Sequence, residues 1–302
     1  MGTRSKAFSC SPNTPLEFLT KYRILELSTC KESTSGGDEM EITISCLQTN
    51  IFPCNPELNI EHMKNKLMEA MNKAPDIVVM PELWTTGYDL ERFSYISDAE
   101  GSITKSFLSK WAKAYNIHIV GGSVAKRTNQ GIYNTMYVVN RNGRIIHEYS
   151  KLHLFRLMDE DKYLQSGQDD SYFELPGIPA CGVICYDIRF PEWIRISVLK
   201  GAKILFVAAE WPKQRLDHWR TLLLARAIEN QCFVVACNRV GSDGKNDFAG
   251  HSIIIDPWGE VMAEGGEQEE IVTAKIDLNK VVQVREMIPV FADRRPDFYT
   301  CE

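Results

Sequence analysis

The sequence lacks an excess of positive charge. Its 302 residues include 34 lysines and arginines against 40 aspartates and glutamates, a formal net charge of −6. A nucleic-acid-binding protein needs a basic surface that displaces counterions from phosphate, so this composition argues against that function. No apolar run approaches the length of a membrane span, and no basic start followed by an apolar core marks a secretory signal. We therefore expect neither nucleic acid nor a membrane among the partners.

Cysteine motifs are also lacking. The nine cysteines are an odd number scattered along a long chain, and no two have the C-x-x-C spacing of a dithiol or zinc site. Most lie in apolar stretches such as ITISCL and FVVACN, where cysteine is typically a small buried hydrophobe. This distribution favours a protein of the reducing cytoplasm.

Several common catalytic motifs are absent from the sequence. It has no G-x-S-x-G elbow, H-E-x-x-H zinc helix, phosphate-binding loop or G-x-G-x-x-G fingerprint. The six histidines are dispersed, and we expect His153 and His218 to be structural hydrogen-bonding residues rather than bases. The sequence therefore implies no metal and no organic cofactor.

The first 39 residues differ in character from the rest. Residues 30–38 are rich in Ser, Thr, Gly and charged side chains without an apolar period, which predicts a mobile segment. A short helix is expected from Leu16 to Leu27. We predict that residues 1–39 are a flexible leader and that residues 40–302 form one domain, with Met40 as an alternative start.

From Met40 onward, strand patterns alternate with helix patterns, and this predicts an α/β domain. Two tight turns, Asn142-Gly143 and Asp256-Pro-Trp-Gly259, each join two strand patterns as β-hairpins. Strands joined by both helices and hairpins indicate a mixed sheet with helices outside it. The predicted strands are 42–46, 76–81, 117–124 and 233–238, the predicted helices are 60–71 and 107–115, and strand–helix units are predicted at 180–200 and 203–230.

Cys185 differs from the other cysteines in its position. It closes the apolar run Ala-Cys-Gly-Val-Ile-Cys, and Tyr-Asp-Ile-Arg-Phe-Pro-Glu then turns the chain into a predicted helix, residues 191–200. Such a turn lifts a side chain out of a sheet, and a helix N-terminus favours a thiolate. The same strand-to-helix turn also offers a backbone N–H to an oxyanion. A plain core cysteine is the alternative.

Glu82 and Lys151 each follow a predicted strand. Glu82 ends the apolar segment Val-Val-Met-Pro-Glu-Leu-Trp, where burial would make it a usable proton acceptor. Taken alone, it could equally be a carboxylate that caps the strand. Lys151, in Tyr-Ser-Lys-Leu-His-Leu-Phe, could likewise be an ordinary solvated lysine.

The segments PELW, YSKLHLF and GVICYDIRFPE, in this order, resemble the catalytic signature of the nitrilase, or carbon–nitrogen hydrolase, superfamily. The resemblance extends from about Met40 to VREMIPVFADRRPDFY. It implies a four-layer αββα sandwich, a catalytic triad of Glu82, Lys151 and Cys185, and a homodimer or a multiple of it. Many members carry a further glutamate after the lysine, and Glu160 is the best match, although acidic residues flank it.

The resemblance also implies a mechanism for cleaving a small amide. Glu82 takes the thiol proton as Cys185 attacks the carbonyl carbon, and water later hydrolyses the thioester. Lys151 and the backbone N–H of Tyr186 hold the oxyanion, and Glu160 positions Lys151 or the substrate.

Three further segments resemble the omega-amidase group, which removes ammonia from the terminal amide of keto acids such as 2-oxoglutaramate and 2-oxosuccinamate. They are HLFRLMDE, AEWPKQRLDHW followed by LLLARAIENQ, and CNRVGSDGKNDFAGHS. Glu210 departs from the pattern, because a neutral residue is expected before the Trp-Pro pair.

A half-amide substrate of this kind needs a cation for its remote carboxylate. Arg215, Arg189 and Arg156 are the candidates, and each could instead be a structural or surface arginine. Trp211 is a candidate apolar wall of the pocket, with a core role as its alternative.

Two other functions stay open. An N-carbamoyl amine amidase, another amidase or a true nitrilase would use the same chemistry on another substrate. A catalytically silent binding protein could share the fold, although such a protein would be expected to lose a triad residue.

Overall fold

The computed structural model describes residues 41–299. The predicted leader at residues 1–39, the helix expected within it and the alternative start at Met40 lie outside the described residues. The six cysteines from Cys46 to Cys237 are free, and four of them besides Cys185 are buried, as the apolar stretches predicted.

The described residues form two mixed β-sheets. The first has seven strands in the order β15-β1-β2-β4-β5-β6, with β3 paired to β4, and the second has six in the order β14-β13-β10-β9-β8-β7. The strands of the first sheet are β1 (Glu41–Gln48), β2 (Ile77–Val79), β3 (Asp98–Ala99), β4 (His118–Thr128), β5 (Gly131–Val139), β6 (Ile145–Ser150) and β15 (Glu270–Asp277). Those of the second are β7 (Tyr172–Leu175), β8 (Ile178–Ile184), β9 (Ile204–Ala209), β10 (Phe233–Asn238), β13 (Ile253–Ile255) and β14 (Val261–Glu264), and β11 (Val240–Ser242) pairs separately with β12 (Asp247–Ala249).

Parallel pairing occupies the centre of each sheet, and antiparallel pairing occupies its edges. Strands β1, β2 and β4 are parallel, as are β8, β9 and β10, whereas β5, β6, β15, β7, β13 and β14 pair antiparallel with their neighbours. Both predicted hairpins are present, and Gly143 and Gly259 adopt the positive φ angles that their turns need, 79° and 91°.

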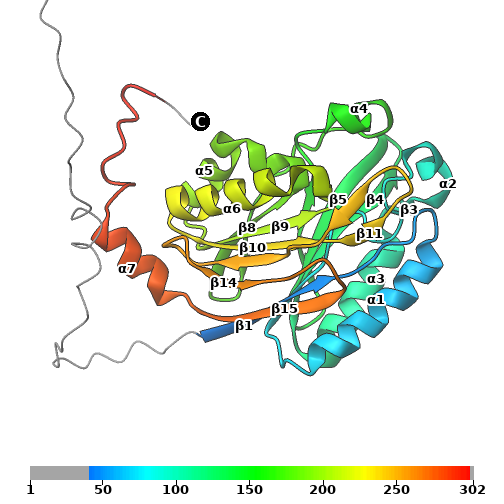
Figure 1. Ribbon diagram of the computed structural model, residues 1–302, viewed down its shortest axis with the longest axis horizontal. Coiled ribbons are helices and arrows are strands. Elements are labelled where there is room, and N and C mark those ends of the chain that lie inside the picture. The colour runs from blue at the N-terminus through cyan, green and yellow to red at the C-terminus, as the bar shows by residue number, and fades with distance from the viewer. Residues whose placement is uncertain (1–40, 300–302) are drawn as a thin grey trace, which may run out of the picture. The chain divides into compact units, whose positions relative to one another are not determined.

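Helices cover the outer face of each sheet, which confirms the four-layer αββα sandwich (Figure 1). Helices α1 (Pro56–Met71) and α3 (Ser102–Tyr115) pack on the first sheet, and α5 (Pro191–Leu199) and α6 (Leu216–Asn230) pack on the second. The shorter helices are α2 (Phe93–Ile96), α4 (Glu160–Tyr163) and α7 (Asn279–Met287), with 3₁₀ turns at Leu90–Arg92, Arg156–Met158, Cys185–Arg189 and Lys213–Arg215.

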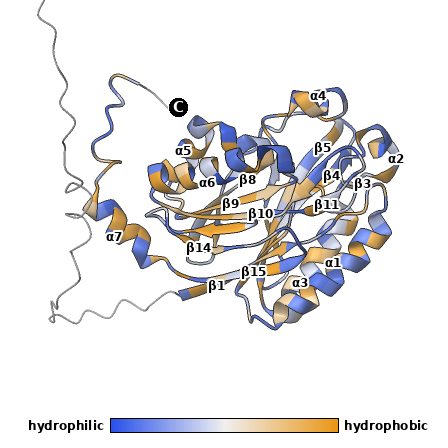
Figure 2. Cartoon of the chain, viewed as in Figure 1, coloured by the Kyte–Doolittle hydropathy of each residue, from blue (hydrophilic) through white to orange (hydrophobic). Residues whose placement is uncertain are grey.

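Alternating residues of the first sheet serve two different hydrophobic cores. Ile44 and Val79 point toward the second sheet and share a buried cluster with its strands, whereas Leu47 and Val78 pack with α1 and α3. Figure 2 shows the resulting pattern, with hydrophobic strands inside and hydrophilic faces on the outer helices. No helix within residues 41–299 combines the length and apolarity needed to cross a membrane.

The two sheets meet at the ends of the strands that carry the predicted site. Glu82 follows β2 in the first sheet, and Cys185 follows β8 in the second. The backbone N–H of Glu82 donates to the carbonyl of Ala209, the last residue of β9, at 3.4 Å. Residues far apart in the sequence are therefore brought to one edge of the sandwich.

Candidate active site

Glu82 is fully buried and accepts four hydrogen bonds. Its Oε1 accepts from Lys151 Nζ at 2.8 Å, from Asn134 Nδ2 at 2.8 Å and from the hydroxyl of Tyr88 at 2.9 Å. Its Oε2 accepts from the backbone N–H of Glu210 at 2.9 Å. This carboxylate is therefore held in place from both sheets.

Lys151 is also fully buried, so the alternative of a solvated lysine is wrong. It follows β6, and its Nζ lies 2.8 Å from Glu82 Oε1 and 2.7 Å from Glu160 Oε1. Burial lowers the pKa of Lys151, but the negative charges of Glu160 and Glu82 outweigh burial and raise it well above its usual value. The site therefore holds a permanent cation.

Of the three successive acids Asp159, Glu160 and Asp161, Glu160 is the one that is buried. Asp159 and Asp161 are exposed, while Glu160 starts α4 and turns inward. Its Oε1 contacts Lys151, and its Oε2 accepts from the backbone N–H of Phe155 at 2.7 Å. Burial raises the pKa of Glu160, and Lys151 opposes that rise.

Cys185 stands at the strand-to-helix turn that the sequence predicted. It follows β8, has a φ of 46°, begins the 3₁₀ turn and is 5% exposed. The expectation of a stabilised thiolate is wrong. Burial and the negative charge of Glu82 raise the pKa of the Cys185 thiol well above its usual value, and the opposing charge of Lys151 does not compensate. The resting thiol is protonated and lies next to a carboxylate.

Asp187 fixes the turn that presents Cys185. Its Oδ2 accepts from the backbone N–H of Ile184 at 3.1 Å and from the hydroxyl of Tyr149 at 2.8 Å. Its Oδ1 accepts from the backbone N–H of His153 at 3.0 Å and contacts the His153 ring at 2.8 Å. Asp187 therefore holds both the backbone and the ring of His153. His218 contacts Arg189 at 3.2 Å.

A small pocket opens beside Cys185. Of the predicted substrate residues, Arg189, Arg215 and Trp211 line it, and the exposed Arg156 does not. The guanidinium of Arg189 lies 4.9 Å from the centre of the Trp211 ring. Trp211 is buried in the main core and also lines this pocket. The remaining lining residues are Tyr88, Phe155, Met158, Tyr186, Glu210 and Pro212.

Residues 43–286 match the family model of the carbon–nitrogen hydrolases. The chain belongs to this family. It is thus an enzyme, a hydrolase that acts on carbon–nitrogen bonds.

Similar proteins agree with this assignment of the carbon–nitrogen hydrolase. A 2-oxoglutaramate amidase of Bacillus subtilis (strain 168) is 56% identical over 260 residues, which are 86% of this chain and 100% of the relative. The omega-amidase YafV of Escherichia coli (strain K12) is 34% identical over 83% of this chain and 96% of its own length. Among solved structures, a CN-hydrolase superfamily protein of Xanthomonas campestris with an arsenic adduct in its active site matches with a TM-score of 0.80 and 31% identity, covering 84% of this chain and 97% of that one.

Two polar residues of the hydrolase site were missed from the sequence. Tyr88 bridges the two glutamates, at 2.9 Å from Glu82 Oε1 and 2.5 Å from Glu160 Oε1, and Asn134 donates to Glu82. Burial and the neighbouring carboxylates raise the pKa of Tyr88, so its hydroxyl stays protonated. Tyr88 had no sequence signal, because a tyrosine in a loop is common. Asn134 had a weak one, because asparagine is depleted in strands and Asn134 lies within β5.

Proposed function

We propose that this carbon–nitrogen hydrolase is an omega-amidase that releases ammonia from the terminal amide of a small 2-oxo half-amide, 2-oxoglutaramate or 2-oxosuccinamate. The 56% identity to a relative named 2-oxoglutaramate amidase carries the substrate assignment. The buried cluster of Glu82, Lys151 and Glu160 beside Cys185 supports the chemistry.

The catalytic roles follow from the charges around the thiol. Because the resting Cys185 is protonated, a base must take its proton during the attack, and Glu82 is the carboxylate that acts on the thiol most strongly. Sulfur then bonds to the amide carbon as the carbonyl π electrons move to oxygen. Lys151 and the backbone N–H of Tyr186 stabilise that oxyanion.

The oxyanion then collapses, and the carbon–nitrogen bond breaks. Ammonia leaves with the proton that Glu82 received from the thiol, so Glu82 is again a carboxylate. It next deprotonates a water molecule, which attacks the thioester, and the thiol regains its proton as the carboxylate product departs. Glu160 keeps Lys151 in place throughout, at 2.7 Å.

The pocket suits a short substrate with a negatively charged far end. Arg189 and Arg215 line it, and their aromatic partners Trp211 and Phe155 hold the guanidinium groups at 4.9 Å and 5.3 Å from the ring centres. A carboxylate that enters a partly dry pocket needs such a cation. We assign the remote carboxylate to this pair.

Ammonia release from matched amides tests the substrate. We expect 2-oxoglutaramate to be hydrolysed about a hundredfold faster, in kcat/KM, than pentanamide, a neutral amide of similar length. Replacing Arg189 or Arg215 by Met should reduce that preference, whereas Arg156→Met should not. Equal rates on both amides, or a preference for an N-carbamoyl amine, would contradict the assignment.

We also propose a cytoplasmic homodimer, or a multiple of it, with the small amide as its main ligand. Free buried cysteines suit a reducing compartment. Exposed apolar side chains near the C-terminus suit contact with a second copy, among them Met287 at 69% and Phe298 at 76% exposure. Retention of all three predicted catalytic residues argues against a silent binding protein.

A further inference from the structure

Glu210, where the omega-amidase pattern leads us to expect a neutral residue, lies beside the proposed reacting groups. It directly follows β9, is 1% exposed and lines the same pocket as Cys185. Its backbone N–H donates to Glu82 Oε2 at 2.9 Å. Glu210 is therefore a further buried acid beside the proposed base, and its carboxyl group feels the charge of Glu82.

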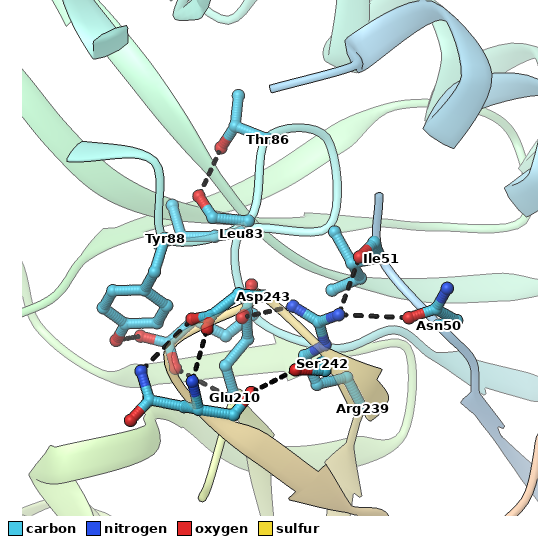
Figure 3. Close-up of polar contacts among 12 residues, drawn as sticks. Asn50, Ile51, Leu83, Thr86, Tyr88, Glu210, Arg239, Ser242 and Asp243 are labelled. Carbon is cyan, nitrogen blue, oxygen red and sulfur yellow. Dashed lines mark hydrogen bonds and ion pairs between the residues drawn. The ribbon is translucent and has the colours of Figure 1, made fainter. Parts of the chain in front are cut away.

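A buried arginine holds one oxygen of this carboxyl group. Arg239 Nη1 donates to Glu210 Oε2 at 2.9 Å, and both side chains are fully buried. Figure 3 shows the guanidinium reaching Glu210 on one side and Asn50 and Ile51 on the other. Its Nε donates to the carbonyl of Val240. Arg239 thus holds Glu210 in place, and its other N–H groups donate to Asn50, Ile51 and Val240.

The other oxygen of Glu210 is unsatisfied. Among the described residues, the buried Oε1 has no hydrogen-bond partner. A buried acceptor without a donor costs free energy, and at a ligand pocket it indicates that the ligand supplies the donor. Burial raises the pKa of Glu210 to about 8 against the opposing charge of Arg239, and the negative charges of Glu82 and Asp243 add to the rise.

We propose that Glu210 Oε1 accepts a hydrogen bond from the nitrogen of the scissile amide and so positions the leaving amino group. This inference rests on the proposed amidase function. When the amide oxygen faces Lys151 and Tyr186, the two N–H groups of the amide point away from them and need acceptors. Glu82 offers one acceptor, and Glu210 offers the second. The ionised Glu210 would repel a substrate carboxylate, which is therefore expected to bind at the end of the pocket lined by Arg189 and Arg215.

Partition of the thioester between water and hydroxylamine tests this position directly. Hydroxylamine attacks the thioester carbon through nitrogen, the Cys185 sulfur leaves, and the surplus nitrogen proton returns to sulfur through Glu82. By microscopic reversibility, the attacking nitrogen occupies the site from which ammonia leaves. The ratio of hydroxamate to acid therefore reports on the amine site, independently of how fast the thioester forms.

In Glu210→Gln, the side-chain oxygen should face Arg239 and its NH₂ should face the pocket, where it repels an N–H donor. We expect the hydroxamate-to-acid ratio to fall about tenfold or more. Glu269→Gln is the matched control, because it also removes a partly buried carboxylate that pairs with cations, but outside the pocket. An unchanged ratio in Glu210→Gln would overturn the proposal, even if total turnover fell.

A second measurement needs no variant, since Glu210→Gln leaves Arg239 without its counter-charge and could prevent folding. Glu210 accepts an N–H best when ionised, so kcat/KM of the wild-type enzyme for an amide should rise about tenfold from pH 7 to pH 9. A flat profile over this range would overturn the proposal. The groups that face Glu210 are Arg239, Glu82 and Asp243, with Tyr88, Cys185, Arg189 and Arg215 around the pocket.

The two proposals can fail separately. If 2-oxoglutaramate is a poor substrate, the omega-amidase assignment fails, and the partition experiment is run on whichever primary amide forms the thioester. If 2-oxoglutaramate is a good substrate and the hydroxamate-to-acid ratio is the same in Glu210→Gln as in the wild type, only the role of Glu210 fails.

Discussion

At the scale of single residues, the site depends on burial of charge. Glu82, Lys151 and Glu160 are all fully buried, which would be unfavourable for any one of them alone. Together they form a cation between two carboxylates. Tyr88 and Asn134 donate to Glu82 Oε1, and the backbone N–H groups of Glu210 and Phe155 donate to the Oε2 atoms of Glu82 and Glu160. The same dry environment favours the protonated Cys185 thiol, so the proposed nucleophile needs its proposed base, Glu82.

Replacing Cys185 by Ala or Ser should abolish ammonia release, by about a thousandfold or more, because the sulfur forms the bond to the amide carbon. The melting temperature should stay within a few degrees. Cys181→Ala, on the strand β8 that precedes Cys185 and also buried, is the control and should keep its turnover. Iodoacetamide labelling that tracks inactivation at another cysteine would assign the nucleophile elsewhere.

Lys151→Ala should lower kcat about a hundred- to thousandfold and change KM little, because the lysine charge is needed as the oxyanion develops. It should also lower the free energy of unfolding by about 3–5 kcal/mol, since two buried carboxylates lose their cation. Steady-state kinetics and urea denaturation measure the two effects. A variant with raised KM and normal kcat would show that Lys151 only binds substrate.

At the scale of elements, the turn after β8 is held by one carboxylate. Asp187→Asn places an NH₂ group among donors from Ile184, Tyr149 and His153. We expect a loss of about 2 kcal/mol in unfolding free energy and a drop in kcat, because the backbone that carries Cys185 is released. Asp170→Asn, an exposed acid paired with Lys200, is the control for both measurements. Equal effects of the two changes would show that Asp187 does not hold the turn.

Glu269, the residue directly before β15, should give the protein part of its resistance to acid. Burial opposes ionisation of Glu269, but the backbone N–H of Asn50 and the His62 ring lower its pKa to about 2. A depressed folded-state pKa contributes stability above the unfolded value of about 4.5, and this is lost as the pH falls toward 2. Wild type should therefore lose about 2 kcal/mol more than Glu269→Gln between pH 5 and pH 2, measured by urea denaturation. Parallel curves would assign the acid sensitivity to other groups.

At the scale of the whole molecule, we expect self-association. The chain should sediment as a dimer or a multiple of it at micromolar concentration, because the apolar side chains of Met287 and Phe298 are exposed on one copy. Replacing both by Asp should weaken the association without changing the fold, as judged by circular dichroism. A wild-type monomer in sedimentation equilibrium would defeat this prediction.

Local pattern was enough to predict most elements of the fold. Alternation at Ile42, Ile44 and Cys46 predicted β1, and turn residues predicted both hairpins, because side-chain period and backbone conformation are local properties. The same pattern implied one mixed sheet, whereas the structure has two. Strand periodicity does not say which strands pair, so the two-sheet arrangement came only from the family resemblance.

The sequence by itself determined the types and the order of the proposed reacting groups, Glu82, Lys151 and Cys185, because distinct motifs carry them. Only the tertiary structure decided the protonation state of these groups and the residues that surround them. Helix position alone predicted a thiolate at Cys185, yet burial beside Glu82 favours the thiol. Tyr88 and the free oxygen of Glu210 likewise became visible only when the two sheets met. Desolvation and hydrogen bonding depend on neighbours in space, which a linear pattern does not specify.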